Sequence, residues 1–408
     1  MNRRGFITAL GAAAAAATIA PERLTAQPRK VRSPRQADTS PDALAERLER
    51  DIPALVNRLI EEGELPGGFS IAVVRDRAII YHGAFGRADR EADAPMTSEA
   101  IFPIGSVTKT FTAALAVKLA ARGLIDLDAS VLPYLPDSVS MHPSLVSGPV
   151  TLRKLLTHRQ GWPRDHATRR NLALGLANDF DPSIADPASF SRAEFYNGLA
   201  QTRALSAPRL TWNYSNLGFH FAAHVLELVT GKEMQELVGA ELAAPLGLVD
   251  TSFRLSPSQR ARVPAGYVFD ARHDAFLRVP AWTAGEIVGA SFLSSTARDL
   301  ARYLITLIDP AASATLLGGE QYQAALLRPY VDFLGGDVPR QQALAWQLTI
   351  FGRYGPIIHH SGDADGHNAY VALSRPHRLG LVLLTNNDNE TNEVLATRLL
   401  FTLFQGEQ

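Results

Sequence analysis

Strand-like segments occur at both ends of this chain, whereas most of the sequence between them has a helical pattern of apolar residues. The first pair, FSIAVV at 69–74 and AIIYHGAF at 78–85, is separated by a three-residue turn. The last group of apolar runs covers 344–351, 356–362, 369–375 and 379–387. A strand must pair its backbone N–H and C=O groups with another strand, and so we expect both ends of the chain to share one sheet.

Short turns between these segments favour antiparallel pairing, because parallel neighbours need long crossover connections. The predicted fold class is therefore α/β: an antiparallel sheet flanked by helices, with a large, mostly helical insertion. We place the α/β sandwich domain at 41–124 and 336–408. The mainly helical domain covers 125–335, and no strand is expected there.

One helix is predicted before the first strands and another after the last ones. The first begins at Ser40-Pro41-Asp42, and Pro53 is expected to kink or divide it before Gly63 ends it. The second runs from about Glu390 to Phe404.

The first 26 residues resemble a twin-arginine export signal. Arg3-Arg4 precede Phe6, an alanine-rich stretch follows, and Leu24-Thr25-Ala26 offers a cleavage site. The alternative is an alanine-rich helix that belongs to the fold. We expect a signal peptide at 1–26, a disordered linker at 27–40, and an exported, periplasmic protein without stable membrane insertion after cleavage.

The composition excludes several classes of function. The chain has 408 residues, no cysteine and a formal net charge of −1. Disulfides, thiolate ligands and a cysteine nucleophile are therefore excluded, and the interleaved charges indicate no nucleic acid as partner. No dinucleotide or P-loop pattern appears, and His220 and His224 lack the glutamate of a zinc-protease motif, so we expect no cofactor and no metal.

Ser106-Val107-Thr108-Lys109 places a hydroxyl and an amine three residues apart at the start of a helix predicted over 106–122. Residues i and i+3 share a helix face, so the amine can reach the serine oxygen. A lysine whose neutral form is favoured by burial can take the serine proton. The alternative is that Ser106 is a helix N-cap and Lys109 a solvated helix residue.

Tyr214 and Asn216 directly precede another predicted helix. A phenol there could pass a proton to the leaving group, and an amide could orient Lys109 and a substrate carbonyl. The alternative is that Asn216 or Ser215 caps the helix while Tyr214 packs on the surface.

His360-Ser361-Gly362 ends a predicted strand. Glycine would let a substrate lie along the strand edge, and the backbone N–H of Asp363 is a candidate oxyanion donor beside that of Ser106. The alternative is a strand that ends in a polar turn.

Other polar residues are interpreted as structural or solvated, among them His158 in LLTHRQG and the pair Arg169-Arg170. The α/β-hydrolase elbow G-x-S-x-G is unsupported, because Ile104 and Thr108 occupy its two glycine positions around the serine.

With these motifs in this order, the chain resembles the serine β-lactamase and penicillin-binding-protein-like family, in particular its class C β-lactamase and family VIII esterase branch. The likeness extends from about 65 to 387 and includes IFPIGSVTKTFTAA, TLRKLLTHRQG, NYSNLGFHFAAHVLELVTG and SSTARDLARYL. The resemblance implies that Ser106 is the acylated nucleophile and Lys109 its base. It also implies that Tyr214 relays protons and that Asn216 binds substrate or supports Lys109.

The sequence departs from this family pattern at His360, which stands where true lactamases have the lysine of Lys-Thr-Gly. A cationic lysine helps to bind the carboxylate of a penicillin, whereas a histidine near neutral pH is only partly charged. Ester or peptide hydrolysis is therefore favoured over lactam hydrolysis. We also hypothesise that Asp363 and Asp365 disfavour anionic substrates and favour an amine.

The leading hypothesis is a serine hydrolase that forms a covalent acyl-enzyme with a small ester or amide, as an esterase or a D-amino-acid-directed peptidase or amidase does. One alternative is a β-lactamase or D,D-carboxypeptidase. An alternative of another class is a non-catalytic protein that binds a muropeptide.

Overall fold

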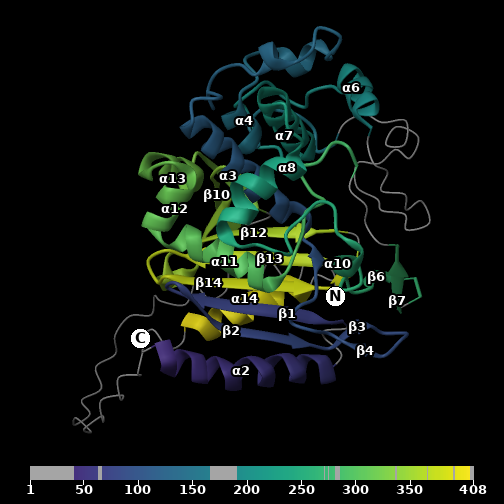
Figure 1. Cartoon of the computed structure of the whole chain (residues 1–408), viewed down its shortest axis with the longest axis vertical. Helices are drawn as coiled ribbons and strands as arrows, with labels where there is room; N and C mark the ends of the chain where they lie inside the picture. The colour runs from purple at the N-terminus through teal and green to yellow at the C-terminus, as the bar shows by residue number, and fades with distance from the viewer. Residues whose placement is uncertain are drawn as a thin grey trace, which may run out of the picture.

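The computed structural model describes residues 41–62, 67–165, 191–270, 272–273, 275–280, 285–335, 338–364, 366–388 and 391–404. Its centre is an eight-stranded sheet in the order β2-β1-β14-β13-β12-β11-β10-β9, in which all neighbours are antiparallel (Figure 1). The strands are β1 (Phe69–Arg75), β2 (Ala78–Phe85), β9 (Val331–Gly335), β10 (Val338–Gln342), β11 (Gln347–Ile350), β12 (Pro356–Asp363), β13 (Asn368–Ser374) and β14 (Leu379–Thr385).

The two ends of the chain meet inside this sheet. Along β1 and β14, Phe69 pairs with Thr385 and Arg75 pairs with Leu379. Every residue of β14 is buried, and so is β1 up to Arg75. Because both faces of these strands are covered, their sequences are continuous apolar runs rather than alternating ones. The predicted antiparallel α/β fold is confirmed.

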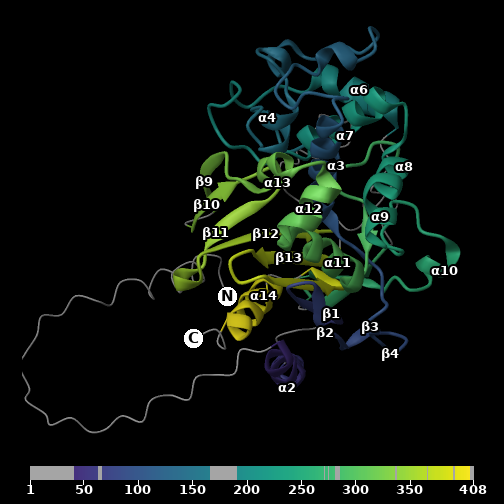
Figure 2. The same ribbon diagram turned by 60° about the vertical axis from the view of Figure 1, so that its left-hand side comes forward.

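Helices cover both faces of the sheet. On one face, α2 (Pro41–Glu61) and α14 (Thr391–Phe404) contact each other and share a buried apolar cluster with the sheet (Figures 1 and 2). On the other face, α11 (Ala297–Ile308) contacts β1, β13 and β14. Pro53 was expected to kink or divide the first helix. It does not divide it, since α2 is one helix with Pro53 inside it. Buried side chains on both sides of Pro53, such as Leu48 and Val56, hold both halves against the sheet and offset the lost hydrogen bond.

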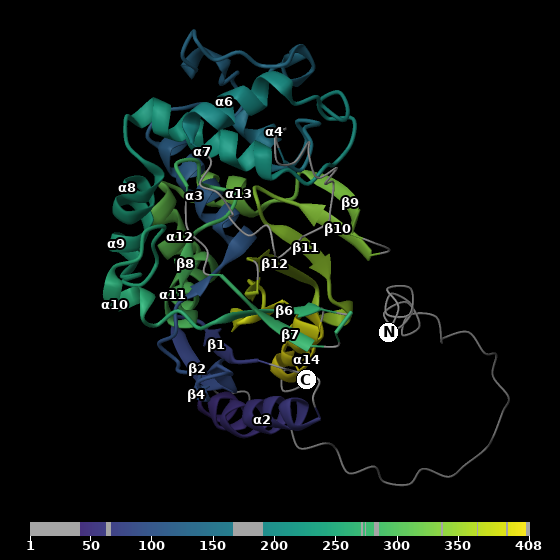
Figure 3. The ribbon, with the colours of Figure 1, turned by 90° about the vertical axis from the view of Figure 1, so that its right-hand side faces the viewer.

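The helical region lies at the end of the sheet away from β2, with α3 (Thr108–Ala121) reaching from it toward the sheet (Figure 3). The other helices in the described residues are α4 (Leu152–Leu156), α6 (Arg192–Gln201), α7 (Asn216–Thr230), α8 (Met234–Val238), α9 (Ala244–Leu246), α10 (Pro257–Arg260), α12 (Pro310–Leu317) and α13 (Glu320–Leu327). Shorter helical turns are η1 (Gly105–Val107), η2 (Leu132–Tyr134), η3 (Pro143–Val146), η5 (Gly239–Ala243) and η6 (Gly352–Tyr354). Nearly all of α3 is buried, so the helix that follows Ser106 has little freedom to move.

The expectation that no strand lies within 125–335 was wrong. β6 (Gly266–Asp270) and β7 (Ala275–Val279) form a hairpin, and β6 also pairs with β15 (Asn387–Asp388). β9 also lies within that range. β6, β7 and β9 each have only five residues, which is too short for the apolar pattern by which a strand is predicted to be clear. Two further short ladders join β3 (Arg87–Asp89) to β4 (Ala94–Pro95) and β5 (Phe102–Pro103) to β8 (Ser294–Ser295).

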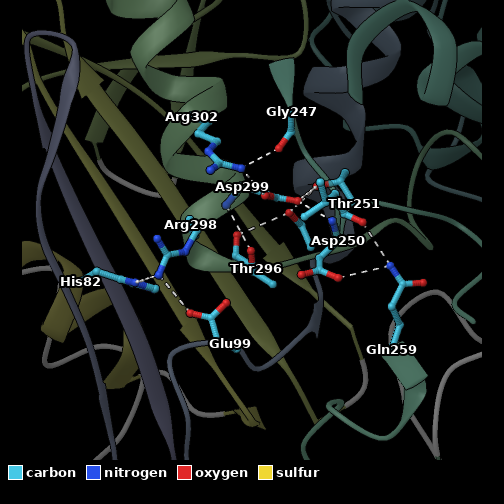
Figure 4. A network of polar contacts seen from close by, with 12 residues as sticks. His82, Glu99, Gly247, Asp250, Thr251, Gln259, Thr296, Arg298, Asp299 and Arg302 are labelled. Atoms are coloured by element: carbon cyan, nitrogen blue, oxygen red, sulfur yellow. Dashed lines mark hydrogen bonds and ion pairs between the residues drawn. The ribbon is translucent and has the colours of Figure 1, made fainter. Parts of the chain in front are cut away.

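A polar network fixes the segment after α9 to the first turn of α11 (Figure 4). Asp299 is buried, and its Oδ2 accepts hydrogen bonds from the Asp250 N–H at 2.8 Å and the Thr251 hydroxyl at 3.1 Å. One turn further on, Arg302 donates to the Gly247 carbonyl at 2.6 Å. The helix that covers the sheet therefore also holds part of the helical region.

Within the described parts of the chain, no single helix is long and apolar enough to cross a membrane. α11 and α12 meet this criterion only when taken together, and they are bent by 99° where they join.

Candidate active site

Ser106 lies in the turn that leads into α3. The turn is the 3₁₀ helix η1, and α3 begins at Thr108, two residues later than predicted. Gly105 has a φ of +46°, a conformation that glycine adopts readily. Ser106 is half-buried while Gly105 and Val107 are buried, so its side chain is the accessible group of a rigid turn.

Strand β12 packs directly against this turn. A Cβ atom at Gly362 would collide with the Ile104 carbonyl, and one at Gly105 would collide with the backbone of Asp363. Both glycines are therefore needed for this close approach of two backbones. A Cβ atom at Gly362 would lie 3.1 Å from Ser106 N, and one at Gly105 would lie 2.6 Å from Asp363 N, so both candidate oxyanion donors belong to this contact.

Lys109 is fully buried beneath Ser106. Its Nζ lies 2.9 Å from Ser106 Oγ, 2.8 Å from Asn216 Oδ1 and 2.8 Å from the Ala290 carbonyl oxygen. The amide and carbonyl oxygens can only accept hydrogen bonds. A neutral amine that donates its two hydrogens to them keeps its lone pair for the hydroxyl hydrogen of Ser106.

Burial lowers the pKa of Lys109 well below its usual 10.5, and the charge of Arg164 lowers it further, while Asp165 opposes the shift. Burial therefore favours the neutral amine over the charged one. The alternative reading of Lys109 as a solvated helix residue was wrong, because none of its surface is exposed.

Tyr214 lies next to both of these residues. Its ring centroid is 4.9 Å from Lys109 Nζ, and its phenol shares a hydrogen bond with Ser106. Burial raises the pKa of Tyr214 to about 12, although the bond with Ser106 and the charge of Arg164 act in the opposite direction. The phenol is therefore protonated at neutral pH and can donate to an atom near the serine.

Asn216 is the first residue of α7, and Ser215 is the N-cap, whose side chain accepts from the Gly218 N–H at 2.9 Å. The sequence left open which of the two residues caps the helix. Because Ser215 does so, the Asn216 amide is available to accept from Lys109 and to donate to Asp165 at 3.0 Å.

His360 is buried close to Lys109, and Ser361 and Asp363 are exposed along the edge of β12. Burial is the main cause that lowers the pKa of His360 to about 3. His360 is therefore neutral at physiological pH, and the expectation that it is partly charged was wrong. The physical reason is that the strand carries it inside the molecule, where its charged form is poorly solvated.

Sequence reasoning missed three residues that contact the site. The Ala290 carbonyl accepts from Lys109, Asp165 accepts from Asn216, and the Arg164 guanidinium lies 5.4 Å from the centroid of the Tyr214 ring. A backbone carbonyl has no sequence signature, and the other two lie in a loop without a motif. Asp365 and the pair Arg169-Arg170 lie outside the described residues.

His220 and His224 lie on α7 without forming a metal site. His224 instead lies 2.6 Å from the Tyr196 hydroxyl and 3.2 Å from a Glu227 oxygen. Within the described segments, no group of three or more His, Asp or Glu side chains is arranged to hold a metal ion.

A protein-family profile described as Beta-lactamase matches residues 52–403. The chain belongs to the beta-lactamase family. This assignment agrees with the antiparallel α/β fold and with the hydroxyl, amine and phenol that the structure brings together.

Among curated members of the beta-lactamase family and its relatives, the chain is 26% identical over 366 residues to the unguisins hydrolase ungD' of Aspergillus campestris, covering 87% of this chain and 65% of that protein. It is 35% identical over 228 residues to the esterase EstB of Burkholderia gladioli, covering 54% and 55% of the two chains. The chain thus spans 65% of the length of the first of these relatives and 55% of the second.

Solved structures show the same fold. The octameric penicillin-binding protein homologue from Pyrococcus abyssi has a TM-score of 0.71 at 24% identity, over 87% of this chain and 77% of that one. The beta-lactamase/D-alanine carboxypeptidase from Yersinia pestis has a TM-score of 0.68 at 19% identity, over 86% and 99% of the two chains. At these identities the likeness is evidence of the beta-lactamase/transpeptidase-like fold alone.

The cavities in the described part of this beta-lactamase-family chain include a larger and a smaller one. The larger, of about 820 Å³, has mainly apolar walls that include Pro103, Val279 and Phe292. The smaller, of about 350 Å³, is lined by charged residues such as Arg192 and Glu227. Ser106 lines neither of them.

Proposed function

We propose that this chain is a serine hydrolase that forms a covalent acyl-enzyme at Ser106 with a small ester or amide. The observation that carries the proposal is the contact set of Lys109, whose Nζ lies 2.9 Å from Ser106 Oγ and 2.8 Å from two oxygens that can only accept hydrogen bonds. A neutral amine in these contacts gives its hydrogens to the two oxygens and keeps its lone pair for the Ser106 hydroxyl. A binding protein has no physical need for a buried amine held in this state.

In the first half of the reaction, Ser106 Oγ attacks the substrate carbonyl carbon and its proton passes to Lys109 Nζ. The carbonyl oxygen becomes an oxyanion beside the backbone N–H groups of Ser106 and Asp363. When the intermediate collapses, the bond to the leaving group breaks. The leaving group takes the proton from the Tyr214 phenol, which recovers one from Lys109.

In the second half, a water molecule attacks the ester bond of the acyl-enzyme. Its proton returns through Tyr214 and Lys109, and Ser106 Oγ leaves as the hydroxyl when it regains a hydrogen. The products are a carboxylic acid and an alcohol or amine, and each group ends in its starting protonation state.

The charges around the serine favour an ester or amide over a penicillin-like lactam. His360 is neutral and provides no cationic partner for a lactam carboxylate. The charge of Arg164 at the site is opposed by Asp165 at 3.8 Å. The curated relatives named as an esterase and a hydrolase support the same class of substrate.

The test is covalent labelling followed by turnover assays. Incubation with a fluorophosphonate should add one adduct to the intact protein, located at Ser106 by peptide mass spectrometry and absent from Ser106→Ala. The wild-type protein should then hydrolyse p-nitrophenyl esters or D-amino-acid anilides faster than nitrocefin. An unlabelled wild-type protein would instead support the non-catalytic muropeptide-binding alternative, and a strong preference for nitrocefin would support a β-lactamase.

A further inference from the structure

His158, which has no role in the proposed mechanism, accepts hydrogen bonds from the backbone on both sides of Tyr214. The backbone N–H of Asn213 donates to the His158 carbonyl at 3.0 Å, and the N–H of Ser215 donates to His158 Nδ1 at 3.0 Å. The His158 ring also stacks on the Tyr214 ring, with a centroid distance of 4.5 Å and an interplanar angle of 30°. The phenol and both peptide groups next to it are therefore fixed by a single residue.

The backbone conformation of His158 makes this double contact possible. Its φ is +57°, in the left-handed region, where histidine is found more often than most non-glycine residues. His158 follows α4, so the left-handed turn reverses the chain and directs both its carbonyl and its ring toward 213–215. The next residue also binds the segment that leads to Tyr214, because the Arg209 N–H donates to the Arg159 carbonyl at 2.7 Å.

The surroundings keep the His158 ring neutral and immobile. The side chain is 2% exposed and lies against Trp212 and Phe219 as well as Tyr214. Burial is the main cause that lowers its pKa well below 6.5. Since Nδ1 accepts from Ser215, the ring hydrogen resides on Nε2.

We propose that His158 is a positioning residue that holds the Tyr214 phenol at the point where it donates a proton to the leaving group. The proposal rests on the proposed function. His158 touches neither Ser106 nor the reacting carbonyl in this arrangement, so its effect must pass through Tyr214. Loss of His158 should therefore slow the hydrolysis of substrates whose leaving group must be protonated more than that of substrates whose leaving group departs as an anion.

The test compares two esters of one acyl group, a p-nitrophenyl ester and an ethyl ester. Nitrophenolate leaves without a proton, whereas ethoxide needs one, and general acid catalysis contributes about 10²–10⁴-fold. For His158→Ala we expect kcat/KM to fall about 10- to 100-fold for the ethyl ester and less than about 5-fold for the p-nitrophenyl ester. His158→Asn tolerates a left-handed φ and offers an oxygen where Nδ1 was, so it should recover part of the ethyl ester activity.

His224→Ala is the matched control, because His224 is also buried and also lies against a tyrosine, at 5.4 Å from the Tyr196 ring. Its ratio of ethyl to p-nitrophenyl rates should equal that of the wild type. In a Tyr214→Phe background, His158→Asn should no longer change that ratio, because the two residues act in one step. If His158→Ala does not fold, the Asn variant and the double variant decide the question.

The proposal would be overturned if the His158 variants lost the same fraction of kcat/KM with both esters, or lost none. In either case the ratio of ethyl to p-nitrophenyl rates would equal that of the wild type. That result is distinct from failure of the proposed function, in which the wild-type protein itself neither takes up the fluorophosphonate nor hydrolyses an ester.

Discussion

At the scale of single residues, the chemistry depends on the charge state of Lys109. The sequence brings the amine within reach of Ser106, but any exposed lysine at that spacing would be protonated at neutral pH. Here its surroundings provide two acceptors and no exposure to solvent. The amine can therefore act as a base at a pH where an ordinary lysine cannot.

This state of Lys109 predicts the pH dependence of acylation. Because the folded pKa lies well below 10.5, kcat/KM should reach its plateau well below pH 10.5 and should fall on the acid side of that plateau, as Lys109 takes up a proton. The measurement is a pH–rate profile with a p-nitrophenyl ester. A tenfold increase per pH unit that continues to about pH 10 would show that the amine is charged in the folded protein.

Removal of the amine should have a larger effect than any pH change. For Lys109→Met we expect kcat to fall by at least about 10³-fold, since the serine loses its base while the pocket keeps its volume. Circular dichroism and the thermal midpoint would serve as the control for folding. Turnover within tenfold of the wild type would exclude Lys109 as the base.

The close approach of β12 to η1 makes a separate prediction for Gly362. A methyl group there meets the Ile104 carbonyl, so Gly362→Ala should separate the two backbones and weaken the oxyanion site by about 10²–10³-fold in kcat. The matched control is Gly239→Ala, because a Cβ atom at Gly239 meets nothing within 4 Å. Similar activity in the two variants would contradict the proposed role of the β12 backbone.

At the scale of elements, short polar networks determine how the helical region sits on the sheet. Asp299 is the clearest case, because its buried carboxylate accepts hydrogen bonds from Asp250 and Thr251, in the segment after α9 (Figure 4). Burial raises the pKa of Asp299, although its hydrogen bonds act in the opposite direction. A carboxylate in this position contributes more to the joining of elements than an exposed ion pair does.

Asp299→Ala should lower the free energy of unfolding by about 2–3 kcal/mol, because two buried donors lose their acceptor. Asp299→Asn keeps one oxygen and should be less destabilising. Arg298→Ala, at an exposed neighbour, is the control and should change stability by less than about 0.5 kcal/mol. Urea unfolding of the three variants would measure these differences, and an equal effect of Asp299→Ala and Arg298→Ala would contradict the role of the network.

Element prediction succeeded where apolar runs were long and failed where strands were short. β1, β13 and β14 were predicted because they are buried almost throughout and are therefore apolar, and β2 and β12 because each begins with an apolar run. The β6–β7 hairpin and β9 were missed because each of these strands has only five residues, too few for a clear apolar pattern. Pro53 does not divide α2, because tertiary contacts, which the sequence does not display, outweigh a local helix breaker.

At the scale of the whole molecule, the two ends of the chain are joined through the sheet and through the helices on its far face. Leu395 and Leu399 of α14 belong to the same buried cluster as Leu48 and Val56 of α2. A polypeptide that ends before α14 would expose one face of β13 and β14. The C-terminal helix is therefore expected to be essential for stable folding.

A chain truncated after 388 should lose cooperative unfolding and bind an apolar dye, because the cluster under α14 is uncovered. Removal of 405–408 alone is the control and should leave the unfolding transition close to that of the full chain. The readouts are soluble yield, dye fluorescence and the thermal transition. A cooperative transition in the longer truncation would show that the sheet does not depend on α14.

The sequence by itself determined the pairing of its two ends, the antiparallel α/β fold and the order of the motifs around Ser106, Tyr214 and His360, because these depend on local patterns and short spacings. Tertiary structure alone decided the charge states of Lys109 and His360. The acceptors that hold Lys109 neutral come from positions 107 and 181 residues away in the chain. The neutral state of His360 and the hold of His158 on Tyr214 likewise arise from burial and from contacts between segments that only folding brings together.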